Sequence, residues 1–216
     1  MGRKVRITRE MILQAAYEIL DEAGIGAVGI KAIASRLGCS TQPVSWVFGS
    51  MKELKKELFR YANARAFAGL PEQMTGRNAI DAFFASGVYY LSIACEHPNV
   101  FRFITVDDPM DTIGEPVRDN KSIFSFEFDA DAANLLAGEY DVPPETIGNT
   151  VKDIVIYTHG LAVMMMHDSY RLPKEDAFKM VYDVGEKLLH SIGIDKIILS
   201  QTVGLYTKPD ESRNWL

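Results

Sequence analysis

The sequence has little cysteine and no long hydrophobic run. Its 216 residues include two cysteines, Cys39 and Cys95, which lie in separate segments without the spacing of metal ligands. This usage excludes a disulfide scaffold and is typical of a reducing compartment. No apolar stretch approaches the roughly 18 residues of a membrane span, and no apolar signal-peptide core follows the basic start. We therefore predict a cytoplasmic chain without a membrane partner.

Motifs of catalysis and metal binding are missing as well. The four histidines, at positions 97, 159, 167 and 190, do not stand four residues from another histidine or cysteine. The sequence contains no HExxH or paired CxxC pattern, and no GxSxG, Walker or GxGxxG element. We predict that the chain is not an enzyme and that it holds neither a cofactor nor a metal.

Sustained alternation of apolar and polar residues, the mark of half-buried strands, is absent before the segment Lys196–Leu199. Apolar residues instead recur at helical spacing, which predicts an all-α fold of about nine helices. Thr8 and Gly24 are suited to begin and end the first helix, Ser40 to cap the third, and Ser50 to cap the fourth. The predicted segments are 9–23, 30–37, 41–48, 51–67, 80–97, 100–106, 119–139, 145–167 and 173–192.

The net charge of −6 conceals two oppositely charged parts. Residues 1–65 contain 11 Lys and Arg against 6 Asp and Glu, a balance of +5, whereas the remaining residues have a balance of −11. A basic segment favours a polyanionic partner, although surface charge also fluctuates by chance. Gly69-Leu70-Pro71 interrupts the fourth helix, so we predict two domains, 1–68 and 69–216.

The second and third helices are joined by only four residues, Leu37–Ser40, which predicts a sharp helix–turn–helix. Such a motif places the N-terminal residues of its second helix in the major groove of DNA. Thr41, Gln42 and Ser45 then point outward, and Gln42 suits an adenine edge. Trp46 has two interpretations: its ring stacks along the DNA, or it closes the domain core. The alternative for the whole motif is an ordinary helical corner.

Residues 8–58 resemble the N-terminal domain of the TetR family of bacterial transcriptional repressors. The matching residues are Ile12-Leu13-x-Ala15-Ala16, Gly24, Ile33-Ala34, Leu37-Gly38-Cys39-Ser40, Phe48 and Leu54. The resemblance implies a three-helix helix-turn-helix DNA-binding domain followed by a helical ligand-binding and dimerisation domain. The usual Tyr-x-His-Phe is Ser45-Trp46-Val47-Phe48 here, Met51 replaces a usual Lys, and Gly29 stands where Thr often caps the second helix.

Three sets of residues are predicted to carry function. The predicted DNA-binding residues are Arg3, Lys4, Arg6, Lys31, Thr41, Gln42, Ser45, Trp46 and Lys52. The predicted effector pocket comprises aromatic and Met side chains of the middle helices, although such stripes also form plain core: Phe84, Tyr90, Phe101, Phe103, Phe124, Phe128, Tyr157 and Met165. The predicted dimer interface comprises Met164, His167, Phe178, Tyr182, Gly185 and Leu189. Its basis is that the last two long helices are apolar on two sides.

Together these features predict a ligand-responsive repressor. A homodimer would bind a palindromic, double-stranded DNA operator and would be released by a small-molecule effector. One alternative is a TetR-like interaction or ligand-binding module that has lost specific operator binding. A small helical enzyme is a second alternative, and it would require paired acid and base groups in the cavity.

Overall fold

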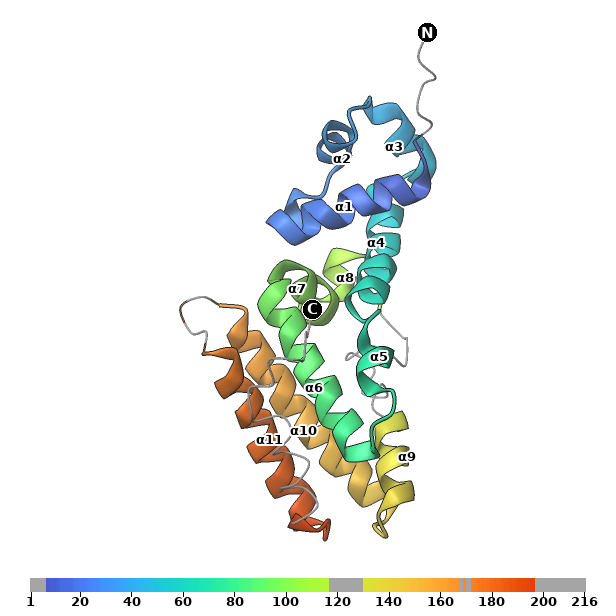
Figure 1. Ribbon diagram of the computed structural model, residues 1–216. Helices are drawn as coiled ribbons and strands as arrows, with labels where there is room; N and C mark the ends of the chain where they lie inside the picture. The colour runs from blue at the N-terminus through green and yellow to red at the C-terminus, as the bar shows by residue number, and fades with distance from the viewer. Residues whose placement is uncertain (1–6, 117–129, 168, 170–171, 197–216) are drawn as a thin grey trace. The chain divides into compact units, whose positions relative to one another are not determined.

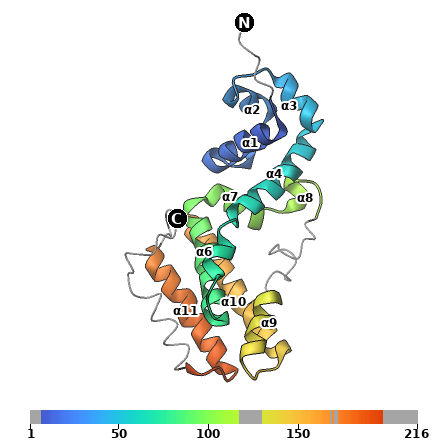
Figure 2. The ribbon, with the colours of Figure 1, turned by 45° about the vertical axis from the view of Figure 1, so that its right-hand side comes forward.

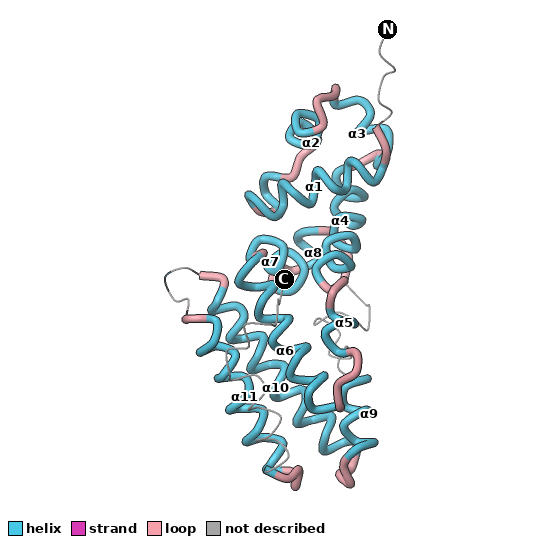
Figure 3. Tube along the Cα trace, viewed as in Figure 1, coloured by secondary structure: helices cyan, strands magenta, loops and turns pink. Residues whose placement is uncertain are grey.

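The computed structural model describes residues 7–116, 130–167, 169 and 172–196, and this part of the chain contains helices and connecting loops but no strand (Figure 3). The all-α prediction is therefore confirmed. The chain divides into two compact units, Met1–Ala68 with Glu96–Arg118, and Gly69–Cys95 with Asp119–Leu216.

The first unit contains the helix-turn-helix (Figure 1). Its elements are α1 (Arg9–Ala23), the 3-10 turn η1 (Ile25–Ala27), α2 (Ile30–Arg36), α3 (Thr41–Phe48), α4 (Met51–Ala66), α7 (Pro98–Thr105) and α8 (Pro109–Thr112). Helix α1 packs against α2, α4 and α7. The core is formed by side chains that are almost fully buried: Ile12, Ala16, Leu20, Ile33, Val44, Leu54, Leu58, Val100 and Phe103.

Local capping explains where several of these helices begin and end. The Thr8 hydroxyl accepts a hydrogen bond from the Met11 amide at 3.2 Å, and Gly24, at φ 78°, closes α1 by donating to the Leu20 carbonyl. The Ser50 hydroxyl caps α4 by accepting from the Glu53 amide at 3.2 Å. The prediction for Ser40 is corrected in part: the residue occupies the N-cap position of α3, but its side chain makes no capping hydrogen bond.

The second unit is a helical bundle (Figure 2). Its elements are α5 (Leu70–Met74), α6 (Ala79–Glu96, of which the last residue is assigned to the first unit), α9 (Ala130–Glu139), α10 (Pro144–Met165) and α11 (Lys174–Ser191). Helix α10 packs against both α9 and α11. The Gly87 Cα lies close to Thr158 and Val181, because a Cβ there would stand 4.0 and 3.6 Å from their methyl carbons. Helix α6 therefore packs against both α10 and α11.

The described residues form eleven α-helices and one 3-10 turn, two α-helices more than predicted. The additional helices are the short α5 and α8, at segments that we expected to be a chain break and a loop because of Pro71 and Pro109. Each proline lies at the first or second helical position, where its missing N–H is not needed. Most of the predicted helix 119–139 and of the strand-like segment 196–199 lies outside the described residues.

Candidate nucleic-acid interface

Helix α3 has one buried face and one exposed face. Val44 and Phe48 are buried in the core of the first unit, whereas Thr41, Gln42 and Trp46 are exposed. Trp46 is 78% exposed, which decides between its two interpretations: the indole does not close the domain core. A tryptophan left this exposed presents a large apolar surface to a partner.

The turn between α2 and α3 is closed by backbone hydrogen bonds. Gly38, at φ 63°, donates to the Ser35 carbonyl, and the Cys39 amide donates to the Ala34 carbonyl at 3.0 Å. A glycine is favoured here because a side chain rarely adopts this left-handed backbone conformation. The close turn fixes the direction in which α3 leaves α2, and thereby the direction of the exposed α3 face.

Ser45 differs from Thr41 and Gln42, the other two polar residues of α3 that are predicted to contact DNA bases. Its hydroxyl donates a hydrogen bond to the Thr41 carbonyl within the same helix at 3.1 Å, and the residue is only partly exposed. The bond occupies the hydroxyl proton in the free protein. The exposed polar groups of α3 that face outward most fully are therefore those of Thr41 and Gln42.

Arg9 holds the C-terminal end of α3, and the sequence analysis did not identify it. Its guanidinium lies over the Phe48 ring, 4.6 Å from the centroid, and donates to the Val47 carbonyl at 3.4 Å. It also donates from Nε to the Glu57 carboxylate of α4 at 2.7 Å. Arg9 thus connects α1, α3 and α4. The sequence offers no signal for this role, because its partners lie 38 to 48 residues away.

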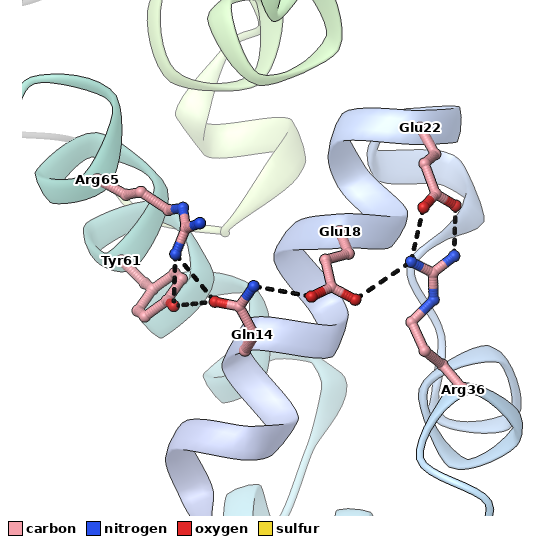
Figure 4. A network of polar contacts seen from close by, with 6 residues as sticks. All are labelled: Gln14, Glu18, Glu22, Arg36, Tyr61 and Arg65. Atoms are coloured by element: carbon pink, nitrogen blue, oxygen red, sulfur yellow. Dashed lines mark hydrogen bonds and ion pairs between the residues drawn. The ribbon is translucent and has the colours of Figure 1, made fainter.

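A second polar network connects α1 with α2 and α4 (Figure 4). Gln14 accepts from the Tyr61 hydroxyl at 2.6 Å and from Arg65 at 3.0 Å, and it donates to Glu18 at 2.8 Å. Arg36, in the last turn of α2, donates to Glu18 at 3.3 Å and forms an ion pair with Glu22. The Arg36 guanidinium lowers the pKa of the Glu22 carboxyl. These bonds fix the helix-turn-helix against the longer helices that support it.

The predicted phosphate-binding cations lie at several places. Lys31, the second residue of α2, and Lys52, the second residue of α4, are both exposed. Arg3, Lys4 and Arg6 of the predicted arm lie outside the described residues. Lys31 and Lys52 leave positive charge next to the two short helices, as a polyanion-binding surface requires.

The predicted effector residues are divided between the two compact units. Phe101 and Phe103 belong to the first unit and are fully buried there, and Phe103 packs edge-on against Phe59 of α4 at 5.5 Å. The structure thus places these two residues in the core of the first unit, apart from the other described effector candidates, which lie in the second unit. Helix α7 is separated in sequence from the helices with which it packs, so the linear order misassigned it.

The remaining effector candidates lie in the second unit or outside the described residues. Phe84 of α6 is buried against the Tyr182 ring at 5.0 Å, and Met165 is fully buried. Tyr157 is half-buried. Phe124 and Phe128 lie outside the described residues.

Tyr90 and His159 form a polar pair between α6 and α10. The Tyr90 hydroxyl and His159 Nδ1 are hydrogen-bonded at 2.8 Å, and both side chains are partly buried. Burial lowers the pKa of His159, because desolvation disfavours the imidazolium. The pair places partly buried hydrogen-bonding groups between α6 and α10, and ligand sites commonly combine a few such groups with apolar side chains.

Three of the six residues predicted to form the dimer interface are covered within their own subunit. Tyr182, Gly185 and Leu189 are buried in their own subunit, where a Cβ on Gly185 would lie 2.5 Å from the Phe84 ring. Met164 and His167 are exposed and Phe178 is half-buried. The sequence showed that α11 is apolar on two sides, but it did not show which side α6 covers.

Exposed apolar residues of α10 and α11 lie elsewhere. On α10, Ile156 is 56% and Met164 is 54% exposed, and Gly160 lies between them at the same four-residue spacing. Met180 is exposed on α11. A Cβ on Gly160 would meet nothing within 4 Å, so the backbone itself is open on this face. Helix α10 therefore carries a row of exposed apolar residues and a glycine, Ile156, Gly160 and Met164, and α11 carries the exposed Met180.

The helix-turn-helix unit is also what the comparisons with known proteins identify. Residues 12–58 match the family model described as bacterial regulatory proteins, tetR family. The resemblance of the N-terminal segment to the TetR family, seen in its sequence, is confirmed over these residues. An uncharacterised HTH-type transcriptional regulator of Bacillus subtilis (strain 168), YobS, is 22% identical over 101 residues. That match covers 47% of this chain and 53% of YobS, so the chain spans about half the length of this curated relative.

Solved structures share the fold. A TetR-like transcriptional regulator from Rhodococcus sp. RHA1 has a TM-score of 0.63 and 15% identity, over 88% of this chain and 98% of that one. A structure described as the molecular basis for control of antibiotic production by bacterial hormones has a TM-score of 0.63 and 17% identity, over 88% and 99%. In the described part of the chain, no helix is both long and apolar enough to cross a membrane.

Proposed function

We propose that the chain is a transcriptional repressor that binds a palindromic DNA operator as a homodimer in the cytoplasm and is released by a small-molecule effector. The exposed face of α3 carries this proposal. Thr41, Gln42 and Trp46 lie on a helix whose other face is anchored in the core by Val44 and Phe48. The helix therefore presents a rigid row of side chains to a partner. The proposal assigns no catalytic step.

The chemistry of this face fits base recognition. The Gln42 amide has both a donor and an acceptor, as bidentate contact with an adenine edge requires. The Trp46 indole supplies an apolar surface of the kind that contacts a thymine methyl group or a deoxyribose. Lys31, Lys52 and the N-terminal arm would neutralise phosphates, which makes the affinity fall as salt rises.

The apolar surface of Ile156, Gly160 and Met164 with Met180 is the proposed dimer interface. Two copies of α10 and α11 would form a four-helix bundle with twofold symmetry. Gly160 would let the two α10 helices approach closely, since it has no side chain to hold them apart. Twofold symmetry would present two α3 helices to the two halves of a palindrome.

Ile156→Glu is expected to convert the dimer into monomers, because it places a charge in the centre of the proposed apolar interface. Sedimentation velocity at a fixed protein concentration measures the change. The matched control is Leu135→Glu on α9, because Leu135 is 54% exposed, almost as much as Ile156, but lies outside the proposed interface. A wild-type protein that is monomeric at micromolar concentration, or equal effects of the two variants, would contradict the proposed interface.

The effector would bind in the second unit, and the Tyr90–His159 pair supplies candidate polar anchors. Binding would favour a dimer geometry in which the two α3 helices no longer match the operator spacing. That mechanism requires the effector to bind one geometry more tightly than the other. The solved structure described as the molecular basis for control of antibiotic production by bacterial hormones supports this part of the proposal, because its protein shares the fold.

Acidification is expected to destabilise the protein over a pH range that the protonation of His159 sets. The folded-state pKa of His159 is lower than its unfolded value of about 6.5, so the unfolded chain binds the proton more readily. Stability is therefore retained above about pH 6.5 and lost as the pH falls toward the folded-state pKa. Thermal melts from pH 7.5 to 5 measure this. His159→Gln is expected to show a smaller loss, whereas the exposed His167→Gln keeps the wild-type loss.

Selection from a pool of random DNA duplexes tests the proposed function. The full chain is expected to enrich one symmetric sequence, with an affinity that falls steeply between about 50 and 200 mM salt. The alternative of a module without operator binding predicts no enrichment. Enrichment of the same sequence by a Thr41→Ala, Gln42→Ala double variant would also contradict the role of α3.

A further inference from the structure

One face of α4 has three cations that converge on a single carboxylate. Lys52, Lys56 and Arg60 recur every four residues and therefore share a face of the helix. Glu115, which follows α8, lies with Oε2 2.7 Å from Lys56 Nζ and with Oε1 3.8 Å from Arg60 Nη2. All four residues belong to the first compact unit. We call the three cations the α4 cation row.

Gly114 allows the chain to approach the α4 cation row closely. It has φ +74°, and a Cβ at this position would lie 2.7 Å from Lys52 Cε and 3.1 Å from Lys52 Nζ. A side chain would be strained by the backbone conformation and would displace the lysine. The backbone thus passes directly beside Lys52 and delivers the next residue, Glu115, to Lys56 and Arg60.

Glu115 interacts electrostatically with all three cations of the α4 cation row. The Lys56 ammonium is the main cause that lowers the pKa of the Glu115 carboxyl, and Arg60 and Lys52 lower it further. Glu115 and then Glu53 in turn raise the pKa of Lys56. The Lys56 side chain is only 18% exposed, and its ammonium also lies 3.4 Å from Glu53 Oε1. The positive charge of the α4 cation row is thus partly neutralised by Glu115 of the same chain.

We propose that the α4 cation row is a phosphate-binding surface and that Glu115 occupies it as an internal competitor of the DNA backbone. The inference rests on the proposed function, in which α3 contacts the bases of DNA. Helix α4 begins three residues after α3 ends. A carboxylate between cations opposes a phosphate at the same place, because each phosphate contact requires an uncompensated positive charge. Glu115 thereby lowers the affinity of the protein for DNA of any sequence and leaves selection to α3.

An ion pair that only stabilises the fold predicts something different. The pair of Glu115 with Lys56 is partly exposed, and ion pairs that solvent reaches contribute little to stability, typically below about 1 kcal/mol. If Glu115 were a structural partner alone, its removal would lower the melting temperature slightly and would leave polyanion binding unchanged apart from the effect of net charge. Affinity for a polyanion, compared with a variant of equal charge, therefore separates the two roles.

The test compares Glu115→Gln with Asp111→Asn in the full chain. Asp111 is exposed on α8, four residues before Glu115, and the substitution changes the net charge equally. The first probe is immobilised heparin, and the readout is the salt concentration that elutes the protein. The second probe is a duplex of unrelated sequence, and the readouts are the dissociation constant and its salt dependence.

Glu115→Gln is expected to elute from heparin at higher salt than Asp111→Asn. On the duplex it should bind roughly threefold to tenfold more tightly at about 0.1 M salt, and the slope of log K against log salt should steepen by about 0.9. Adding Lys56→Gln should reverse both changes. Equal behaviour of Glu115→Gln and Asp111→Asn on heparin would overturn the inference. Failure of the wild-type chain to bind any duplex would instead contradict the proposed function, because heparin reports on the row without an operator.

Discussion

Gln42→Ala is expected to weaken operator binding by about 1–3 kcal/mol for each half-site, because the proposed bidentate contact to a base is lost. For a symmetric dimer both half-sites are affected, so the dissociation constant should rise at least tenfold. Gln42 is exposed at the start of α3, and the core of the first unit does not use its side chain. The fold should therefore remain intact, and fluorescence anisotropy with a labelled operator measures the loss.

The control for Gln42→Ala is Asn149→Ala, which also removes an exposed side-chain amide, from α10 in the second unit. It should leave the affinity unchanged within about twofold. The salt dependence adds a second readout: the contact proposed for Gln42 is with a base and not with a phosphate, so the slope of log K against log salt should stay the same. A lower slope in Gln42→Ala would show that its role is a backbone contact.

Gly185→Ala is expected to destabilise the second unit by about 1–3 kcal/mol through overpacking. The new Cβ would lie 2.5 Å from Phe84 Cε1 and 2.8 Å from Cζ. The Phe84 ring is almost fully buried and packs against Tyr182 at 5.0 Å, so it has little space to move away. The expected result is an earlier denaturant midpoint, measured by circular dichroism at one fixed protein concentration.

Gly148→Ala is the control for Gly185→Ala, because it also replaces a glycine within a helix but is expected to raise the stability instead of lowering it. Gly148 lies within α10, and a Cβ there would meet nothing within 4 Å. Alanine is favoured over glycine in a helix interior by about 0.5–1 kcal/mol, so this variant should be slightly more stable than the wild type. Equal midpoints for the two variants would contradict the close contact between α6 and α11.

Much of the fold could be predicted because its signals are local. The Thr8 cap, Gly24 and the Ser50 cap each act within a few residues of the helix end that they define. The four-residue link between the second and third helices likewise determines a sharp turn. Proline was the misleading signal: Pro71 was interpreted as an interruption of the fourth helix, but it lies at the start of the short helix α5.

The candidate sites were harder to predict because they depend on distant pairs. The spacing of apolar residues shows that α11 is apolar on two faces. The close approach of Gly185 to Phe84 shows which of these faces is covered within the same subunit. Phe103 was assigned to the second domain because it follows the predicted boundary, yet it packs against Phe59. Arg9 and Glu115 also act through partners far away in sequence.

Trp46 shows how the structure adds to a sequence pattern. Spacing alone left its ring either in the core or on the surface, because the third helix is only eight residues long. Its exposure places it on the same face as Thr41 and Gln42. The departure from the usual family pattern therefore leaves an indole on the exposed face of α3, and this face differs in chemistry from one built around tyrosine and histidine.

Footprinting of the full chain on its selected duplex tests the central claim most directly. Two copies of α3 in successive major grooves predict two protected patches on one side of the duplex, related by twofold symmetry. Their centres should lie about 10–10.5 base pairs apart, or a multiple of that distance. A single protected patch, or protection without symmetry, would contradict the account of a dimer that reads a palindrome with α3.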